Sequence, residues 1–224
     1  NSPYSQYGLG TLGEQSGGFN RGMNGLGIGF NEHNQVNSLN PASYATIDSL
    51  SFIFDAGISG QITSYSESGV KVNAKNANFA YVIAGFRLAK RLGLSFGLLP
   101  FSNIGYSYSN TKALNSTDGS TSVVKATNTY SGTGGLHQVY LGLGWTPFKG
   151  FAIGVNAAYL WGDYSRSVIN SYTDAYANTL SKYYTAEVHN YKLDFGMQYT
   201  QKITKNDAIT LGVTYGLGHK LSSD

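Results

Sequence analysis

Residues 191–217 alternate between large apolar side chains and polar or small ones at nearly every position. A short break at 204–207 divides this stretch into two segments. A period of two predicts β-strands with one apolar face, and transmembrane barrel strands have lipid against that face and a wet interior against the other. The apolar positions are Tyr191, Leu193, Phe195, Met197 and Tyr199, then Ile209, Leu211, Val213, Tyr215 and Leu217.

Similar alternation predicts five earlier strands, at about 50–63, 77–89, 91–110, 133–146 and 151–167. Short links alternate with long polar ones, which cover about 64–76, 111–130 and 168–185. Outer-membrane barrels have short periplasmic turns and long external loops. The sequence therefore predicts an all-β fold, a transmembrane antiparallel β-barrel wall of about seven strands, with the long links outside.

Residues 1–49 differ from the rest of the chain. They are rich in glycine, and neither a helical nor a strand period persists in them. We expect two parts, an irregular N-terminal plug or hatch at 1–49 and barrel strands at 50–224.

The odd number of strands requires an explanation. Closed bacterial barrels have an even count, and an open sheet edge is costly in lipid. Either a strand from residues 19–30 closes a small eight-stranded barrel, or the chain is the truncated part of a larger one, and we expect the second.

Composition supports the membrane interpretation and excludes other classes. Charged residues make up 12% of the chain, against about 25% in soluble domains. No apolar run is long enough for a transmembrane helix, and there is no cysteine. The net charge of +3 is dispersed, which argues against nucleic acid, and no residue spacing indicates a metal site, a cofactor or catalysis. We expect no enzyme.

Three short motifs carry a family resemblance. They are Asn40-Pro41-Ala42 at the end of the glycine-rich segment, residues 143–147 leading into 150–156, and the opening residues 2–10. Together they resemble FadL-type hydrophobic-compound transporters of the outer membrane, in a Bacteroidota-like form. The resemblance implies a fourteen-stranded barrel plugged by residues 1–49, of which this chain would be the first half, in the outer membrane of a Gram-negative bacterium.

Two candidate sites follow, each with an alternative. By resemblance, Pro100, Phe101, Ser102 and Asn103 form a lateral opening in the third strand, whereas proline in a strand also marks a simple bulge above the membrane belt. Asn40, Pro41 and Ala42 either shape the hatch or form an ordinary Asn-Pro turn.

A third set of polar residues lies on the strand faces assigned to the lumen. These side chains could line a solute path, but we expect them to pair with each other or with the plug, because charges inside barrels are satisfied locally. They are Asp55, Arg87, Asn156, Asp163, Lys192, Asp194 and Gln198.

Two functions are compatible with these features. The first is a channel for passive uptake of hydrophobic small molecules, whose partners are the bilayer and a hydrophobic ligand. The alternative is a non-transporting accessory or scaffold barrel in an outer-membrane assembly or secretion complex, whose partners are other outer-membrane proteins.

Overall fold

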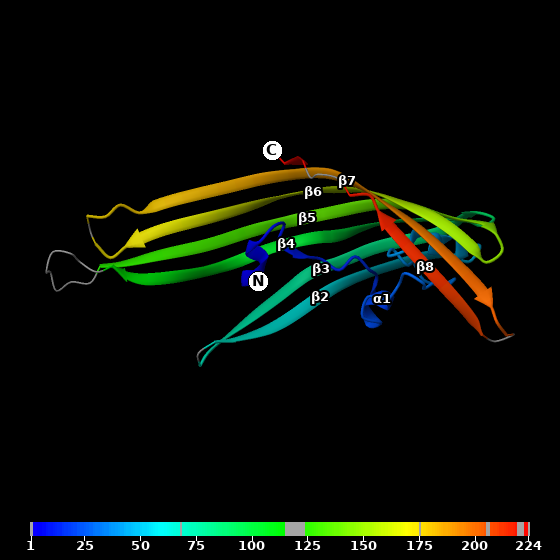
Figure 1. Cartoon of the computed structure of the whole chain (residues 1–224), viewed down its shortest axis with the longest axis horizontal. Helices are drawn as coiled ribbons and strands as arrows, with labels where there is room; N and C mark the ends of the chain where they lie inside the picture. The colour runs from blue at the N-terminus through cyan, green and yellow to red at the C-terminus, as the bar shows by residue number, and fades with distance from the viewer. Residues whose placement is uncertain are drawn as a thin grey trace.

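The computed structural model describes residues 2–67, 69–114, 124–174, 176–204, 207–218 and 222–223. Seven long antiparallel strands pair in sequence order and form one curled sheet, shaped like half a barrel (Figure 1). They are β2 (Phe52–Glu67), β3 (Val70–Ala89), β4 (Leu92–Leu114), β5 (Val124–Phe148), β6 (Phe151–Tyr172), β7 (Leu180–Lys202) and β8 (Ala208–Gly216).

The predicted antiparallel all-β sheet is thus confirmed, but the long links were predicted wrongly. Most of 64–76, 111–130 and 168–185 belongs to strands that continue beyond the apolar alternation, although 115–123 lie outside the described residues. These extensions escaped prediction because both of their faces carry polar residues, so no period of two separates them from loops.

The N-terminal segment, residues 2–51, holds only short elements. They are η1 (Pro3–Gln6), β1 (Thr11–Leu12), α1 (Gly18–Gly22) and η2 (Pro41–Thr46). The alternative in which residues 19–30 supply an eighth strand is wrong, because α1 and irregular turns occupy that stretch. A two-residue strand, β9 (Ser222–Ser223), pairs with β7.

Among the described residues, no helix has both the length and the apolar character needed to cross a membrane.

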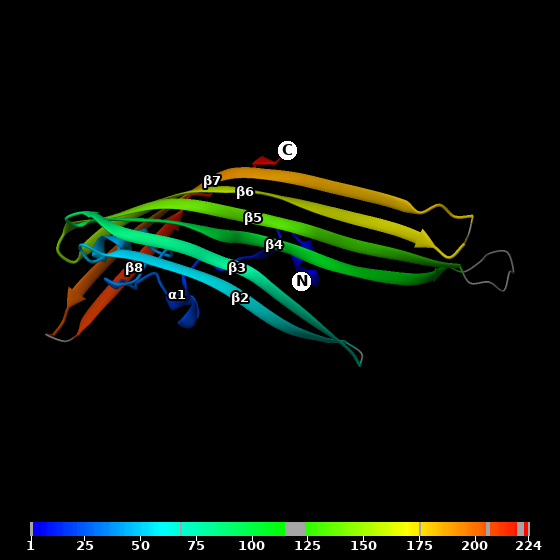
Figure 2. The same cartoon turned by 180° about the vertical axis from the view of Figure 1, so that it is seen from behind.

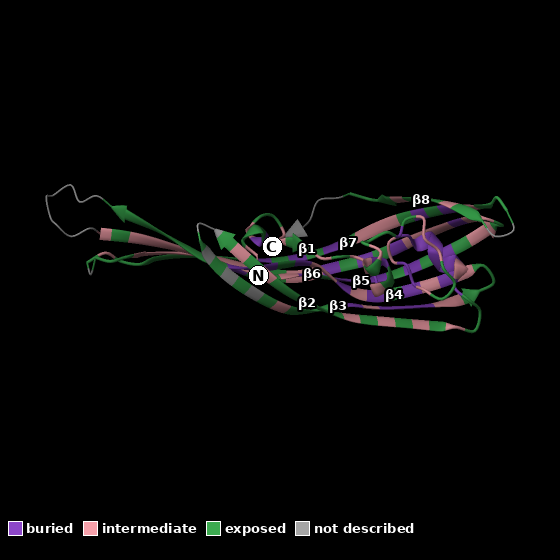
Figure 3. Cartoon of the chain, turned by 90° about the horizontal axis from the view of Figure 1, so that it is seen from below, coloured by how far each residue is buried: buried purple, intermediate pink, exposed green. Residues whose placement is uncertain are grey.

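The two faces of the sheet differ as the alternation predicts. In β7, Phe195 and Met197 are exposed on the convex face, whereas Gln198 is 2% exposed on the concave face. In β3, whose phase was ambiguous in the sequence, Tyr81 and Ile83 are buried beside the N-terminal segment. Buried positions gather where that segment lies against the concave face (Figure 3).

The sheet is divided at one end. β3 pairs with β4 only between Val82↔Leu98 and Ala89↔Leu92, so the outer part of the β2–β3 hairpin diverges from β4 (Figures 1 and 2). Beyond this point β4 to β7 continue together as a four-stranded extension. We call it the blade, and it comprises 104–114, 124–134, 164–172 and 180–186.

Candidate functional site

The candidate site is the interface between the N-terminal segment and the concave face of the sheet. Four glycines lie side by side there across β4 to β7, in the register Gly93↔Gly144↔Gly154↔Gly196. A Cβ atom at any of them would collide with residues 40–45, and the one at Gly144 would lie 2.5 Å from the Pro41 carbonyl oxygen. The glycine row therefore forms a flat shelf on which η2 rests.

Asn40 fixes η2 to this shelf and is fully buried. Its Oδ1 accepts a hydrogen bond from the Ala42 N–H at 3.1 Å, which caps the helix start. Its Nδ2 donates to the carbonyl oxygens of Ile28 at 2.7 Å and Met197 at 3.2 Å. Asn40-Pro41-Ala42 is thus a capped turn and also the point at which the segment contacts β7.

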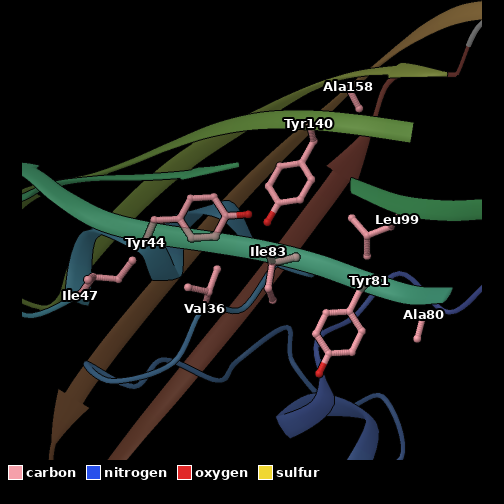
Figure 4. Packing of buried hydrophobic residues seen from close by; sticks show 9 residues of the cluster. All are labelled: Val36, Tyr44, Ile47, Ala80, Tyr81, Ile83, Leu99, Tyr140 and Ala158. Carbon is pink, nitrogen blue, oxygen red and sulfur yellow. The ribbon is translucent and has the colours of Figure 1, made fainter. Parts of the chain in front are cut away.

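Tyr44 follows on the same short helix and is also fully buried. Its hydroxyl donates to Asn156 Oδ1 at 3.1 Å, and its ring packs in a cluster with Val36, Ile47 and Tyr140 (Figure 4). Burial raises the pKa of the Tyr44 hydroxyl well above its ordinary value, because the phenolate would lose its hydration.

Most polar residues predicted to line the lumen contact the N-terminal segment or each other. Gln198 Nε2 donates to the Ile28 and Phe30 carbonyls at 2.9 and 3.0 Å. Lys192 Nζ lies 2.8 Å from Asp194 Oδ2, beside a cavity of about 190 Å³ that Asn156 also lines. Asp55 accepts a hydrogen bond from the Tyr81 hydroxyl at 3.0 Å, next to Gly17.

Two of the predicted lumen residues behave differently. Arg87 is partly buried, and its Nε has no hydrogen-bond partner within the described part of the chain. Asp163 is exposed and pairs in register with Glu187. It lies an odd number of positions along β6 from Asn156, whose side chain faces inward. Asp163 nevertheless lines the cavity of about 740 Å³ that the N-terminal segment also borders, and its assignment to the lumen stays a prediction.

Pro100 marks an irregularity in β4. The β4–β5 register shifts between Pro100 and Ser102, as expected for a bulge. At this point the edge of β4 that faces β3 is no longer paired with β3, and it pairs with the N-terminal segment instead. Thr11 pairs with Asn103 and Leu12 with Ser102, and the Gly13 N–H donates to the Phe101 carbonyl at 2.8 Å. The four predicted residues therefore lie where β1 covers the free edge of β4.

A cavity of about 740 Å³ lies at this division, between the β2–β3 hairpin and β4. Its lining is mixed and includes Gln61, Asn78, Pro100, Thr11 and Arg21. Across the described ranges, no group of three or more potential ligand side chains could hold a metal ion.

The glycine shelf, Tyr44 and Gln15 were missed by reasoning from the sequence. Gln15 Nε2 donates to the Pro100 carbonyl at 2.9 Å, and its Oε1 accepts from Gln138. The shelf left a signal, since Gly93, Gly144, Gly154 and Gly196 all fall on the polar face of their strands. The signal was not interpretable because their alignment depends on the registers of four strands.

A curled antiparallel sheet with an exposed apolar outer row and a chain segment inside it defines the class of outer-membrane β-barrel proteins. All of residues 1–224 match the family model described as BamG, and the chain belongs to the BamG family. Comparison with curated proteins and with solved structures gave no match.

This family assignment overturns two expectations. BamG is associated with the outer-membrane assembly complex BAM and is distinct from the FadL-type transporters, so the resemblance was wrong. The principal function inferred from it, uptake of hydrophobic compounds, is wrong for the same reason, and the family favours the accessory-subunit alternative. Its three motifs were short, and turn-forming or glycine-rich segments recur in unrelated barrels.

Proposed function

We propose that this protein is a non-enzymatic accessory subunit of an outer-membrane protein assembly complex. Membership of the BamG family over the whole chain is the observation that carries the proposal. The convex apolar row faces lipid, and the blade extends to the external side. Lipid does not tolerate free strand edges, so the proposal includes further strands that close the wall, fourteen in total. It also places the protein in a member of the Bacteroidota.

The interior geometry supports a structural rather than a transporting role. Asn156 and Gln198, two residues that could have lined a solute path, instead hold the N-terminal segment. Lys192 and Asp194 neutralise each other. We therefore assign residues 2–51 as a fixed plug that sets the shape of the wall, and not as a gate.

The test is affinity purification of the tagged full-length protein from native outer membranes in mild detergent. We expect subunits of the assembly complex to co-purify in constant ratio, and depletion to lower the amount of folded outer-membrane proteins in heat-modifiability gels. A protein that always runs alone, and whose depletion leaves those levels unchanged, would contradict the proposal.

A further inference from the structure

The two faces of the blade have different chemistry, which follows from the strand registers. On the convex face the first rows are Ser107↔Ser131↔Ser167↔Tyr183 and Ser109↔Thr129↔Ile169↔Ser181. Hydroxyl pairs connect the strands there, such as Ser131 with Ser167 at 2.6 Å. Short hydroxyl side chains predominate on this face, which also carries Tyr183, Ile169 and Lys125.

The concave face carries aromatic, amide and basic side chains instead. Tyr108 stacks on Tyr130 with ring centroids 5.2 Å apart, and the Arg166 guanidinium lies 5.0 Å from the centre of the Tyr164 ring. The row Ile104↔Gly134↔Tyr164↔Ala186 begins this face, and the four rows beyond it are Tyr106↔Gly132↔Arg166↔Tyr184, Tyr108↔Tyr130↔Val168↔Lys182, Asn110↔Asn128↔Asn170↔Leu180 and Lys112↔Ala126↔Tyr172.

Charge on the concave face has a single sign. Lys112, Arg166 and Lys182 are its basic residues, and none of the four rows contains Asp or Glu. Tyr184 and Lys182 are exposed, so this surface is open above the N-terminal segment. Tyr and Arg are enriched at the centres of protein interfaces, where rigid rings supply contact area at low entropic cost.

The chain itself shows what kind of ligand the surface accepts. The short 3-10 helix η1 and the turn that follows it lie along its lower edge, where Arg166 donates to the Gly8 carbonyl oxygen and the Tyr108 hydroxyl donates to Gln6. The Ser2 N–H donates to the Gly105 carbonyl at 2.9 Å. These contacts use main-chain and amide groups, which any polypeptide offers.

We propose that the concave face of the blade is a docking site for an acidic polypeptide segment of another subunit of the assembly complex. This inference rests on the proposed function and adds to it the surface and the chemistry of the partner. The partner's segment lies next to residues 2–8 and runs from there toward the tip of the blade. Its carboxylates face Lys112 and Lys182, and its main chain lies against the Tyr and Asn rows.

Neighbouring residues on opposite faces provide a matched test in the full-length protein. A photo-cross-linking amino acid replaces Asn110 on the concave face or Thr111 on the convex face, and cells are irradiated before purification. We expect a protein adduct from position 110 with a subunit that co-purifies with the wild type, and none from position 111. An adduct from 111 alone, no adduct from 110, or an adduct from 110 with lipopolysaccharide only would refute the docking site.

Charge reversal gives an independent measurement. The double variant Lys112→Glu/Lys182→Glu should lower co-purification of the complex by about 10-fold, most strongly at low salt, because unlike charges steer association. Lys125→Glu on the convex face is the control and should change nothing. Equal losses in both variants would overturn the inference. If the wild-type protein co-purifies with no other subunit, the proposed function fails. If the complex co-purifies equally well with the wild type and with the Lys112→Glu/Lys182→Glu variant, only the docking site is refuted.

Discussion

Replacing Gly154 by alanine tests whether the glycine shelf holds the N-terminal segment. The new Cβ would lie 2.5 Å from the Ala42 nitrogen and closer still to the Pro41 carbonyl group, where ordinary contact begins at 3.4 Å. Backbone atoms cannot rotate away as a side-chain tip can, so η2 must move by roughly 0.9 Å or more. Such a shift would break the 3.2 Å hydrogen bond from Asn40 Nδ2 to the Met197 carbonyl.

The magnitude combines two effects. Overpacking a filled site costs about 1–3 kcal/mol, and each hydrogen bond lost contributes about 1 kcal/mol. We expect the Gly154→Ala variant to weaken docking of the segment by about 3 kcal/mol, which raises the undocked population ~100-fold.

Limited trypsin digestion measures this population. Arg21 is the only lysine or arginine in residues 1–70, so cleavage after it reports on the N-terminal segment alone. In the docked state its guanidinium donates to the Ser16 and Glu14 carbonyls, each at 2.9 Å, and lies over the Tyr81 ring. We expect cleavage at Arg21 to accelerate in proportion to the undocked population.

Gly60→Ala is the matched control, because a Cβ there meets no atom within 4 Å. It should cleave at the wild-type rate. The reasoning would be refuted if the Gly154→Ala variant stayed as protected as this control with an unchanged urea midpoint.

Three further substitutions test other contacts of the structure. Asn40→Ala removes the cap of η2 and two hydrogen bonds to main-chain carbonyls, and should cost about 2 kcal/mol in urea titrations followed by the fluorescence of the two tryptophans. Tyr44→Phe leaves Asn156 without its donor and should cost about 1–2 kcal/mol. Because burial raises the folded-state pKa of Tyr44, its contribution to the free energy of unfolding is fully present below the unfolded pKa of about 10 and declines as pH rises above that value. The Tyr44→Phe variant should therefore lose stability less steeply than the wild type between about pH 10 and 12. Arg91 has a φ of 67° in the β3–β4 turn, and Arg91→Gly should raise the thermal midpoint by relieving about 1 kcal/mol of strain; a lower midpoint would show that the 3.3 Å bond from Arg91 to the Pro147 carbonyl matters more.

The sequence alone was sufficient to predict the strands that have one apolar face. Phe195, Met197 and Gln198 lie on the predicted sides of β7, because alternation is a property of the local backbone and needs no knowledge of distant residues. The lack of long strands before residue 52 was equally predictable, since glycine-rich stretches without a period do not form long strands.

The tertiary structure decided what these elements do together. The glycine shelf exists because four strands align Gly93, Gly144, Gly154 and Gly196, and a slip of one residue in any strand would turn its glycine to the opposite face. The division between β3 and β4 and the aromatic, basic face of the blade likewise depend on pairing between remote segments. Gln6 and Tyr108, for example, meet across 102 positions of the chain. Short motifs carry no information about such pairings, which is why local resemblance suggested a transporter that the family assignment does not support.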